Sequence, residues 1–183
     1  MEQKIKIERH NPEWEKTFRC LSSIYQKKLG SLILSIEHVG STSVKGLSSK
    51  PIIDIDIVIQ NNHLLPPVIK GLEELGYYHE GDLGIKNREA FARTNQNVPK
   101  DNEGTIWMAH HLYVCLQNSE ELKRHLIFRD YLRQNLDAAH AYESLKKELA
   151  RSTNDRESYT RGKGDFIESI LNNPKRIQIF KKR

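Results

Sequence analysis

The feature that most constrains this chain is a run of isoleucine and valine interrupted by two aspartates that are separated by one residue. The run covers residues 52–59 and carries Asp54 and Asp56. Its length and its β-branched residues predict a buried strand. A buried carboxylate that has no partner costs several kcal/mol. We therefore expect a cationic group beside the two aspartates.

Alternation along a strand decides how these side chains point. Asp54 and Asp56 share one face, roughly 6 to 7 Å apart along the backbone. The opposite face carries Ile53, Ile55 and Ile57. Two carboxylates at this spacing can share a magnesium ion, which takes oxygen ligands and keeps several waters. The alternative is an edge strand whose aspartates face water.

A glycine–serine pair precedes this strand. Gly40 and Ser41 follow a second expected strand, and twelve residues separate Ser41 from Asp54. Glycine lets the backbone approach a ligand closely, and the start of a short helix leaves N–H groups that can bind phosphate oxygens. The pair alone is typical of an ordinary turn. Together with the two aspartates it indicates a site for phosphate and metal.

This arrangement resembles a known superfamily. A hydrophobic residue, Gly-Ser, about a dozen further residues and Asp-x-Asp on a strand form the pattern of the nucleotidyltransferases related to DNA polymerase beta. The stretches 36–44 and 50–56 resemble the GrpB family within that superfamily. The likeness continues through residues 110–114, 128–133 and 159–161, so it spans nearly the whole chain.

The resemblance implies an α+β fold, in which helices flank a nucleotidyltransferase-like mixed β-sheet and further helices follow at the C-terminal end. We expect a single domain over residues 1–183, with an α/β catalytic core at 1–117 and a helical part at 118–183. The apolar pattern agrees with this organisation. It predicts strands at 32–38, 52–59, 77–80, 88–94 and 105–116, and helices at 13–29, 64–75, 137–151 and 157–172. One more helix is expected to begin at Asn118, with Glu121 completing a capping box.

A polymerase-beta-like site usually has a third carboxylate on the strand beside the Asp-x-Asp strand. The matching stretch here, residues 106–115, contains none. His111 and Tyr113 are the polar pair on the relevant face, whereas His110 points to the other face. A neutral His111 can ligate metal or take a proton from an acceptor hydroxyl. The alternative for His111 is a hydrogen-bonded structural histidine.

Phosphoryl transfer also requires positive charge around the triphosphate. The candidates are Lys50, Arg88, Arg93, Arg161 and Lys163, and the resemblance favours Arg93 and Lys163 among them. Each can equally be a solvated surface charge. The formal net charge of +5 suits a polyanionic ligand, although such a charge is also common on ordinary soluble proteins.

We therefore expect a nucleotidyltransferase, dependent on magnesium or manganese, that moves NMP from a nucleoside triphosphate to an unknown acceptor. Asp54 and Asp56 are the expected metal ligands and catalytic residues, and His111 is the third catalytic residue. The expected substrate-binding residues are Gly40, Ser41, Lys50, Arg93, Arg161 and Lys163. Because no separate RNA-binding module is evident, a small-molecule or protein acceptor is favoured over a long nucleic acid.

Two other functions fit the same sequence. The first is a non-catalytic nucleotide-binding or regulatory domain on the same fold, since the third carboxylate is missing. The second is an interaction module that binds an acidic partner through the basic helical end. The two cysteines lack the spacing of a zinc site, and no apolar run reaches membrane-spanning length. These observations predict a cytoplasmic protein.

Overall fold

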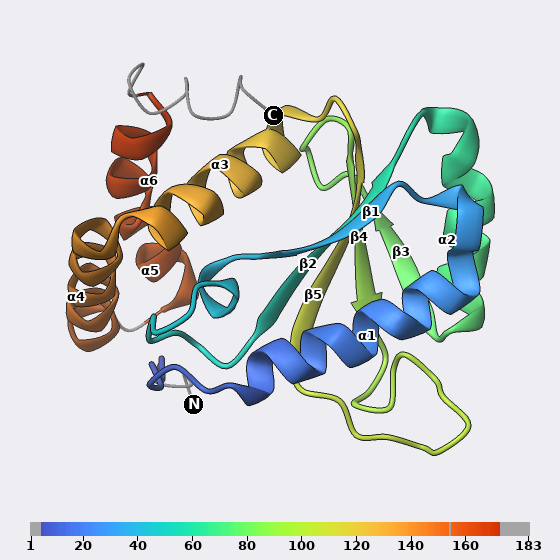
Figure 1. The fold of residues 1–183 in the computed structure, drawn as a ribbon, viewed down its shortest axis with the longest axis horizontal. Coiled ribbons are helices and arrows are strands. Elements are labelled where there is room, and N and C mark those ends of the chain that lie inside the picture. Colours follow the sequence, from blue (N-terminus) through green and yellow to red (C-terminus); the bar gives the residue numbers. More distant parts are fainter. Residues whose placement is uncertain (1–4, 154, 173–183) are drawn as a thin grey trace.

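The strands form a mixed five-stranded sheet in the computed structural model, which describes residues 5–153 and 155–172 (Figure 1). The spatial order is β1 (Ser35–Val39), β2 (Ile53–Ile59), β5 (His110–Leu116), β4 (Arg88–Arg93) and β3 (Tyr77–Gly81). β2 and β5 run parallel, and the other neighbouring pairs run antiparallel. The Asp-x-Asp strand β2 thus lies between two strands and is not an edge strand.

Helices cover both faces of this sheet. They are α1 (Glu13–Leu29), α2 (Leu65–Glu74), α3 (Glu120–Gln134), α4 (Leu136–Ser152), α5 (Arg156–Gly162) and α6 (Gly164–Leu171). α1 and α2 pack on one face, while α3 lies across the other, with α4, α5 and α6 beyond it (Figure 1). Short 3₁₀ turns occupy Gly30–Leu32, Ser41–Ser43 and Asn62–Leu64.

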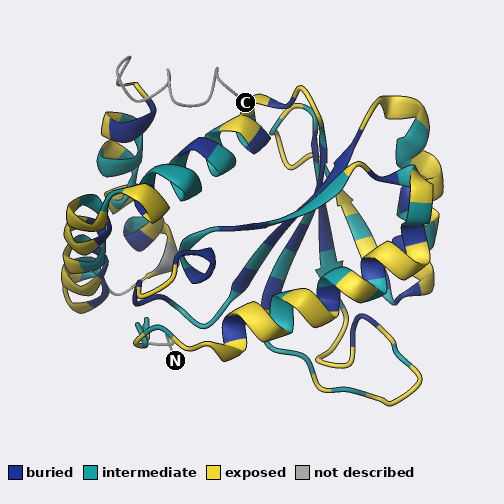
Figure 2. Cartoon of the chain, viewed as in Figure 1, coloured by how far each residue is buried: buried dark blue, intermediate teal, exposed yellow. Residues whose placement is uncertain are grey.

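The main hydrophobic core lies between the sheet and the helices α1 and α2. Ile53, Ile55 and Ile57 of β2 are completely buried there, against side chains that include Trp14 and Leu72 (Figure 2). Burial of each such side chain contributes roughly 1.5 to 3 kcal/mol. This apolar face fixes the orientation of β2, and the aspartates of the same strand must therefore face α3.

The predicted fold class is confirmed, and the first helix has the predicted bounds. The strand expected from residue 32 begins instead at Ser35, because Leu32 belongs to the 3₁₀ turn that follows α1. The strand expected from residue 105 begins at His110. The residues just before His110 pack against the preceding loop instead of joining the strand, because the backbone N–H of Trp107 donates to Gln96 O.

Two expectations for the C-terminal helices are corrected. The helix expected at 157–172 is two helices, α5 and α6, which meet at Lys163 between two glycines. Glycine is a poor helix former, so a break at this point is physically reasonable. The cap of α3 is Ser119 rather than Asn118, and its hydroxyl accepts a hydrogen bond from the backbone N–H of Leu122.

The helices of the described residues also bear on the question of a membrane. None of them combines the length and the apolarity that crossing a bilayer requires. The basic end that suggested an interaction module, residues 173–183, lies outside the described residues.

A buried chain of hydrogen bonds links α1 to the sheet within the main core. The Tyr25 and Tyr77 hydroxyls lie 2.6 Å apart, and the Tyr77 hydroxyl lies 2.5 Å from His110 Nε2. His110 Nδ1 lies 2.9 Å from Met108 O. Burial lowers the pKa of His110 to about 4, so the ring is neutral near pH 7. With its proton on Nδ1, the ring donates to Met108 and accepts from Tyr77.

Tyr77→Phe removes the central hydroxyl of this chain. It leaves the polar atoms of Tyr25 and His110 buried without the partner they share, so we expect the free energy of unfolding to fall by about 1 to 3 kcal/mol. Urea unfolding measures the change. The matched control is Tyr78→Phe, because Tyr78 is 48% exposed; its effect should stay within about 0.5 kcal/mol. Equal effects of the two substitutions would contradict this role of Tyr77.

Candidate active site

The parallel pairing of β2 with β5 brings the predicted catalytic residues together. Asp54 lies opposite His111 in the register, and Asp56 lies opposite Tyr113. His111 Nδ1 lies 2.7 Å from Asp54 Oδ1. The side chain of Asp54 is 32% exposed, whereas that of Asp56 is fully buried. His111 thus lies on the same wall as Asp54, as expected, and His110 faces the core on the other side.

The glycine–serine turn lies directly against Asp54. Gly40 has a φ of +67°, and a Cβ atom at this position would lie 2.1 Å from Asp54 Oδ2. No L-residue side chain fits in that space. The turn continues into the 3₁₀ segment Ser41–Ser43, where the Ser43 hydroxyl donates to Gly40 O at 2.6 Å. A close backbone approach to a ligand was expected at Gly40; the structure shows a close approach to the carboxylate of Asp54.

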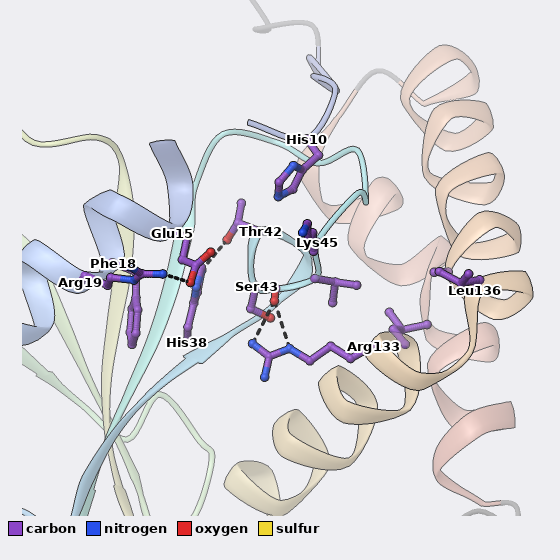
Figure 3. Close-up of a pocket in the computed structure, with 13 residues that line it drawn as sticks. His10, Glu15, Phe18, Arg19, His38, Thr42, Ser43, Lys45, Arg133 and Leu136 are labelled. Atoms are coloured by element: carbon purple, nitrogen blue, oxygen red, sulfur yellow. Dashed lines mark hydrogen bonds and ion pairs between the residues drawn. The ribbon is translucent and has the colours of Figure 1, made fainter. Parts of the chain in front are cut away.

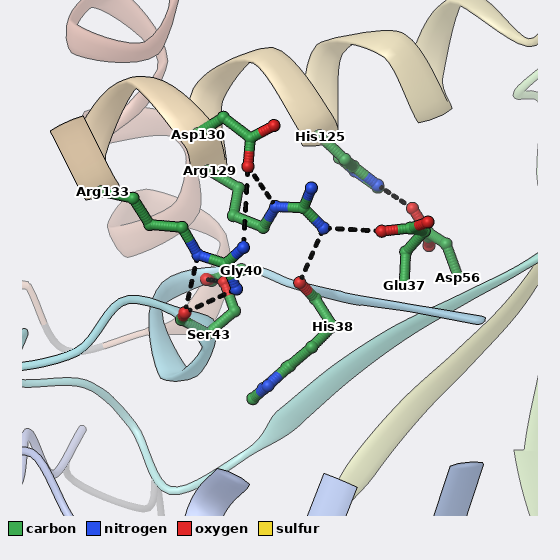
Figure 4. A network of polar contacts seen from close by, with 9 residues as sticks. All are labelled: Glu37, His38, Gly40, Ser43, Asp56, His125, Arg129, Asp130 and Arg133. Atoms are coloured by element: carbon green, nitrogen blue, oxygen red, sulfur yellow. Dashed lines mark hydrogen bonds and ion pairs between the residues drawn. The ribbon is translucent and has the colours of Figure 1, made fainter. Parts of the chain in front are cut away.

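The cation beside the buried aspartate is His125 of α3, which the sequence did not reveal. His125 Nδ1 lies 2.7 Å from Asp56 Oδ2 (Figure 4). His125 Nε2 lies 3.2 Å from Glu121 Oε1. Burial alone would lower the pKa of His125. Hydrogen bonds to the two carboxylates outweigh burial and raise this pKa to about 10. His125 is therefore an imidazolium at neutral pH.

His125 belongs to a polar stripe of α3 formed by Glu121, His125, Arg129 and Arg133, spaced four residues apart. Arg129 Nη1 donates to Glu37 Oε2 of β1 at 2.8 Å. Arg133 donates from Nε and Nη2 to Ser43 O, at 3.1 and 2.9 Å (Figure 4). Residues four apart share a helix face, so the spacing was visible in the sequence. The residues that this helix face contacts could not be read from the sequence.

Two adjoining cavities meet at Asp54. The lysine cavity, of about 240 Å³, is lined by Ser41, Ser49, Lys50, Ile52, Asp54, His111, Lys146, Tyr159, Thr160 and Lys163. The arginine cavity, of about 300 Å³, is lined by Val39, Gly40, Ser41, Asp54, Arg88, Tyr113, Glu121, Arg124, His125, Phe128, Tyr142, Lys163, Ile167 and Leu171. The residues common to both are Ser41, Asp54 and Lys163. A ligand that occupies both cavities would contact the carboxylate of Asp54.

Lys50 and Lys163 lie at the site as expected, with their amino groups 3.9 and 4.6 Å from the centre of the Tyr159 ring. Two predicted substrate-binding residues are not brought there. Arg93 lies on the opposite face of the sheet, because it alternates in phase with Phe91, and its Nη1 donates to Trp107 O. Arg161 is exposed and lines neither cavity.

A further cavity, of about 420 Å³, lies near the Ser41–Ser43 turn but is not lined by either aspartate (Figure 3). Its wall includes His38, which stacks on Phe18 with ring centres 4.6 Å apart. Burial lowers the pKa of His38 to about 4. His38 Nε2 lies 3.0 Å from the Thr42 hydroxyl. These contacts give His38 a structural role, and the candidate site is confined to the other two cavities.

Comparison with known proteins agrees with this architecture. The family model described as GrpB protein matches residues 4–173. The chain belongs to the GrpB family. It is 35% identical to the glutamate-rich protein GrpB of Alkalihalophilus pseudofirmus, over 89% of this chain and 91% of the relative. It is 31% identical to YqkA of Bacillus subtilis over 94% of this chain, but this match spans only 48% of YqkA.

Solved structures extend the comparison to the fold. The crystal structure of the conserved protein GrpB from Enterococcus faecalis matches with a TM-score of 0.78 and 29% identity, over 96% of this chain and 99% of that chain. The Cid1 poly(U) polymerase, in a structure with bound MgGTP, matches with a TM-score of 0.55 and 14% identity. That match covers 79% of this chain and 44% of Cid1. The GrpB chain therefore has a nucleotidyltransferase-like fold.

Gly40→Ala tests the contact between the turn and Asp54. The new methyl group would overlap Asp54 Oδ2, so we expect a larger loss of unfolding free energy in the native background than in an Asp54→Ala background, where Oδ2 is absent. The left-handed backbone strain is common to both backgrounds and cancels. We expect a coupling of about 1 to 3 kcal/mol, from a double-mutant cycle measured by urea unfolding.

Gly46→Ala is the control for backbone strain alone, because Gly46 has a φ of +84° and no atom within 4 Å of a built Cβ. It should show no coupling to Asp54→Ala. If the coupling free energy between Gly40→Ala and Asp54→Ala is zero, the turn relaxes away from Asp54 and the predicted overlap does not occur.

Lys146 gives a prediction about pH. Its side chain is buried, its Nζ donates to Ser48 O at 2.5 Å, and burial lowers its pKa from 10.5 to about 7. Between these two values the unfolded chain holds a proton on Lys146 that the folded chain has lost, so acidification favours unfolding. We expect Lys146→Met to stabilise the protein most below pH 7, with a benefit that shrinks as the pH rises toward 10. Thermal unfolding across this range measures it, and a benefit independent of pH would contradict the shifted pKa.

Proposed function

We propose that this protein is a magnesium-dependent nucleotidyltransferase that moves NMP from a nucleoside triphosphate to a small-molecule or protein acceptor. The observation that carries the proposal is the position of Asp54. Its carboxylate lies at the junction of two cavities, against a glycine–serine turn and within hydrogen-bond distance of His111. A reaction that joins two substrates needs such a junction.

The lysine cavity suits the triphosphate. Lys50, Lys146 and Lys163 line it, and Asp54 is the acidic residue of this lining. Because burial lowers the pKa of Lys146 to about 7, this lysine carries only part of a positive charge at neutral pH. A wall with this excess of cations attracts phosphate oxygens, and phosphoryl transfer depends chiefly on such positioning and charge stabilisation. Ser41 adds a hydroxyl at the end nearest Asp54. The arginine cavity, with charges of both signs, is left for the acceptor.

The two aspartates fit a magnesium ion. Asp54 reaches both cavities, and Asp56 Oδ1 is buried without a hydrogen-bond partner among the described residues. No cluster of three or more His, Cys, Asp or Glu side chains suited to a metal occurs in that part of the chain. Magnesium is commonly held by one or two carboxylates together with substrate phosphates. When bound, it would neutralise the phosphate oxygens and make the α-phosphorus more electrophilic.

His111 supplies the base in this proposal. With Nδ1–H donating to Asp54 Oδ1, the ring is held in one orientation and Nε2 is the atom that can accept a proton. An acceptor hydroxyl placed at Nε2 would lose its proton to this nitrogen as its oxygen attacks the α-phosphorus, and the bond from the α-phosphorus to the bridging oxygen would break so that pyrophosphate leaves. The pair resembles a carboxylate-oriented histidine base, in which the carboxylate also stabilises the protonated ring.

One observation favours a second candidate function, nucleotide binding without turnover. Asp56 is fully buried, and His125 already neutralises it from α3. The strand beside β2 offers no third carboxylate, because its corresponding residues are His111 and Tyr113. A domain of this kind would bind the triphosphate in the lysine cavity and release no pyrophosphate.

The test of the proposal combines binding with turnover. The full chain is incubated with each nucleoside triphosphate and magnesium or manganese, with and without a low-molecular-weight cell extract as the source of acceptor. Pyrophosphate release is measured. We expect Asp54→Asn and His111→Ala to lower release by about 100-fold or more while thermal unfolding shows an intact fold, because each removes a group that acts on the reacting atoms.

A binding titration separates the two candidate functions. Lys163→Ala should weaken triphosphate binding by about tenfold, the loss expected for one charge-assisted contact. The matched control is Arg161→Ala, because Arg161 is close in sequence but lines neither cavity. Binding without pyrophosphate release from any triphosphate would support the non-catalytic function. Absence of binding would reject both.

A further inference from the structure

Arg88 is a buried arginine that forms no ion pair with the described residues. It is the first residue of β4 and only 8% exposed. Its Nε has no hydrogen-bond partner, and no ion pair of Arg88 occurs within the described ranges 5–153 and 155–172. Burial of an unpaired charge is unfavourable by several kcal/mol. A bound anion would therefore stabilise this guanidinium.

The guanidinium lies at the arginine cavity. Its carbon is 4.3 Å from the centre of the Tyr113 ring, so the ring packs against the charged plane. The opposite walls of the cavity are largely apolar and come from β1, α3 and α6, with Val39, Phe128, Ile167 and Leu171. A volume of about 300 Å³ suits a small molecule with an aromatic or aliphatic body.

Two other cationic side chains that line this cavity have acidic partners. Arg124 pairs with Glu168 and with Glu121. His125 pairs with Asp56 and with Glu121. Arg88 has no carboxylate within ion-pair distance among the described residues, although Glu121 of the same cavity is near enough to attract it electrostatically. One singly charged anion would complete an ion pair with Arg88. A doubly charged phosphate monoester would also bring its second charge close to Glu121, which lines the same cavity.

We infer that the arginine cavity binds a small organic carboxylate, and that Arg88 receives the carboxylate group. A guanidinium can donate two parallel hydrogen bonds to a carboxylate, which a lysine cannot do. Given the proposed function, this ligand is the acceptor. Its apolar body lies between Arg88 and the walls contributed by Phe128 and Ile167, and its far end reaches Asp54, which lines the same cavity.

The binding test uses three phenyl compounds that differ in the head group: phenylacetate, its neutral amide phenylacetamide, and phenyl phosphate. The full chain, labelled with ¹⁵N-arginine, is titrated with each while the Arg88 Nε–H resonance is followed by NMR. No metal or nucleotide is present. We expect phenylacetate to bind at least about tenfold more tightly than the amide, and to shift the Arg88 signal.

Arg88→Met should abolish the preference for phenylacetate over the amide, and Arg88→Lys should reduce it. Arg93→Met is the matched control, because Arg93 lies on the same strand but on the opposite face of the sheet and does not line this cavity; binding should change by less than about twofold. The inference is overturned if Arg88→Met leaves phenylacetate binding unchanged, if the amide binds equally well, if phenyl phosphate binds more tightly, or if no probe shifts Arg88.

A stability measurement distinguishes ligand binding from a structural role. Arg88→Met removes an unpaired buried charge, so the variant without ligand should unfold at a higher temperature than the native protein. A structural arginine would give the opposite result. The titration is independent of turnover. Binding of phenylacetate without pyrophosphate release would support the carboxylate site and reject the proposed enzymatic activity. Pyrophosphate release without Arg88-dependent binding of phenylacetate would support the activity and reject the carboxylate site.

Discussion

The burial of Asp56 is the constraint on which the arrangement of this protein depends. A carboxylate with no exposed surface on a central strand requires a cation, and His125 can provide it only if α3 lies across the sheet with one particular face inward. The apolar contact beneath α3 is small, and its buried members are Val58, Cys115 and Leu122. Farther along the helix, Leu132 packs in a second apolar cluster with Val44 and Leu47. The charged pairs and these apolar contacts together define the orientation of α3.

Once α3 has this orientation, both cavities follow from it. The helix closes one side of the arginine cavity through Glu121 and His125. The helices that follow it then bring Lys146 and Lys163 to the lysine cavity. The two cavities consequently differ in charge although they share Asp54, and this difference supports separate places for the two substrates. The 48% coverage of YqkA means that a unit of this kind also occurs within a longer chain.

Much of this arrangement could be predicted from local sequence. Alternation in the Ile-rich strand fixed the faces of Asp54 and Asp56, and the resemblance to a family identified the neighbouring strand and hence His111. The sequence also indicated that a cation must accompany the aspartates, but it could not identify His125. That residue is 69 positions away from Asp56, and its partner depends on how a helix docks onto a sheet.

Arg93 was predicted to lie at the site but does not, for a related reason. The family resemblance indicated a basic residue in this strand, but the face of β4 is set by its register with β5, which local patterns do not determine. Arg88 lies on the site face and Arg93 on the core face. The break between α5 and α6 shows the same limit. The apolar periodicity of the sequence continues across Lys163, but the helical conformation of the backbone is interrupted there.

The polar stripe of α3 also limits how this family can vary in length. Within this stripe, His125, Arg129 and Arg133 meet three different partners because they recur at a constant angle around the helix. One residue inserted between Glu121 and His125 would turn every later position by about 100°. The contacts to Asp56, Glu37 and Ser43 would then be lost together rather than one at a time. Evolution can exchange residues on the outer side of this helix, but an insertion or deletion within it removes the whole set.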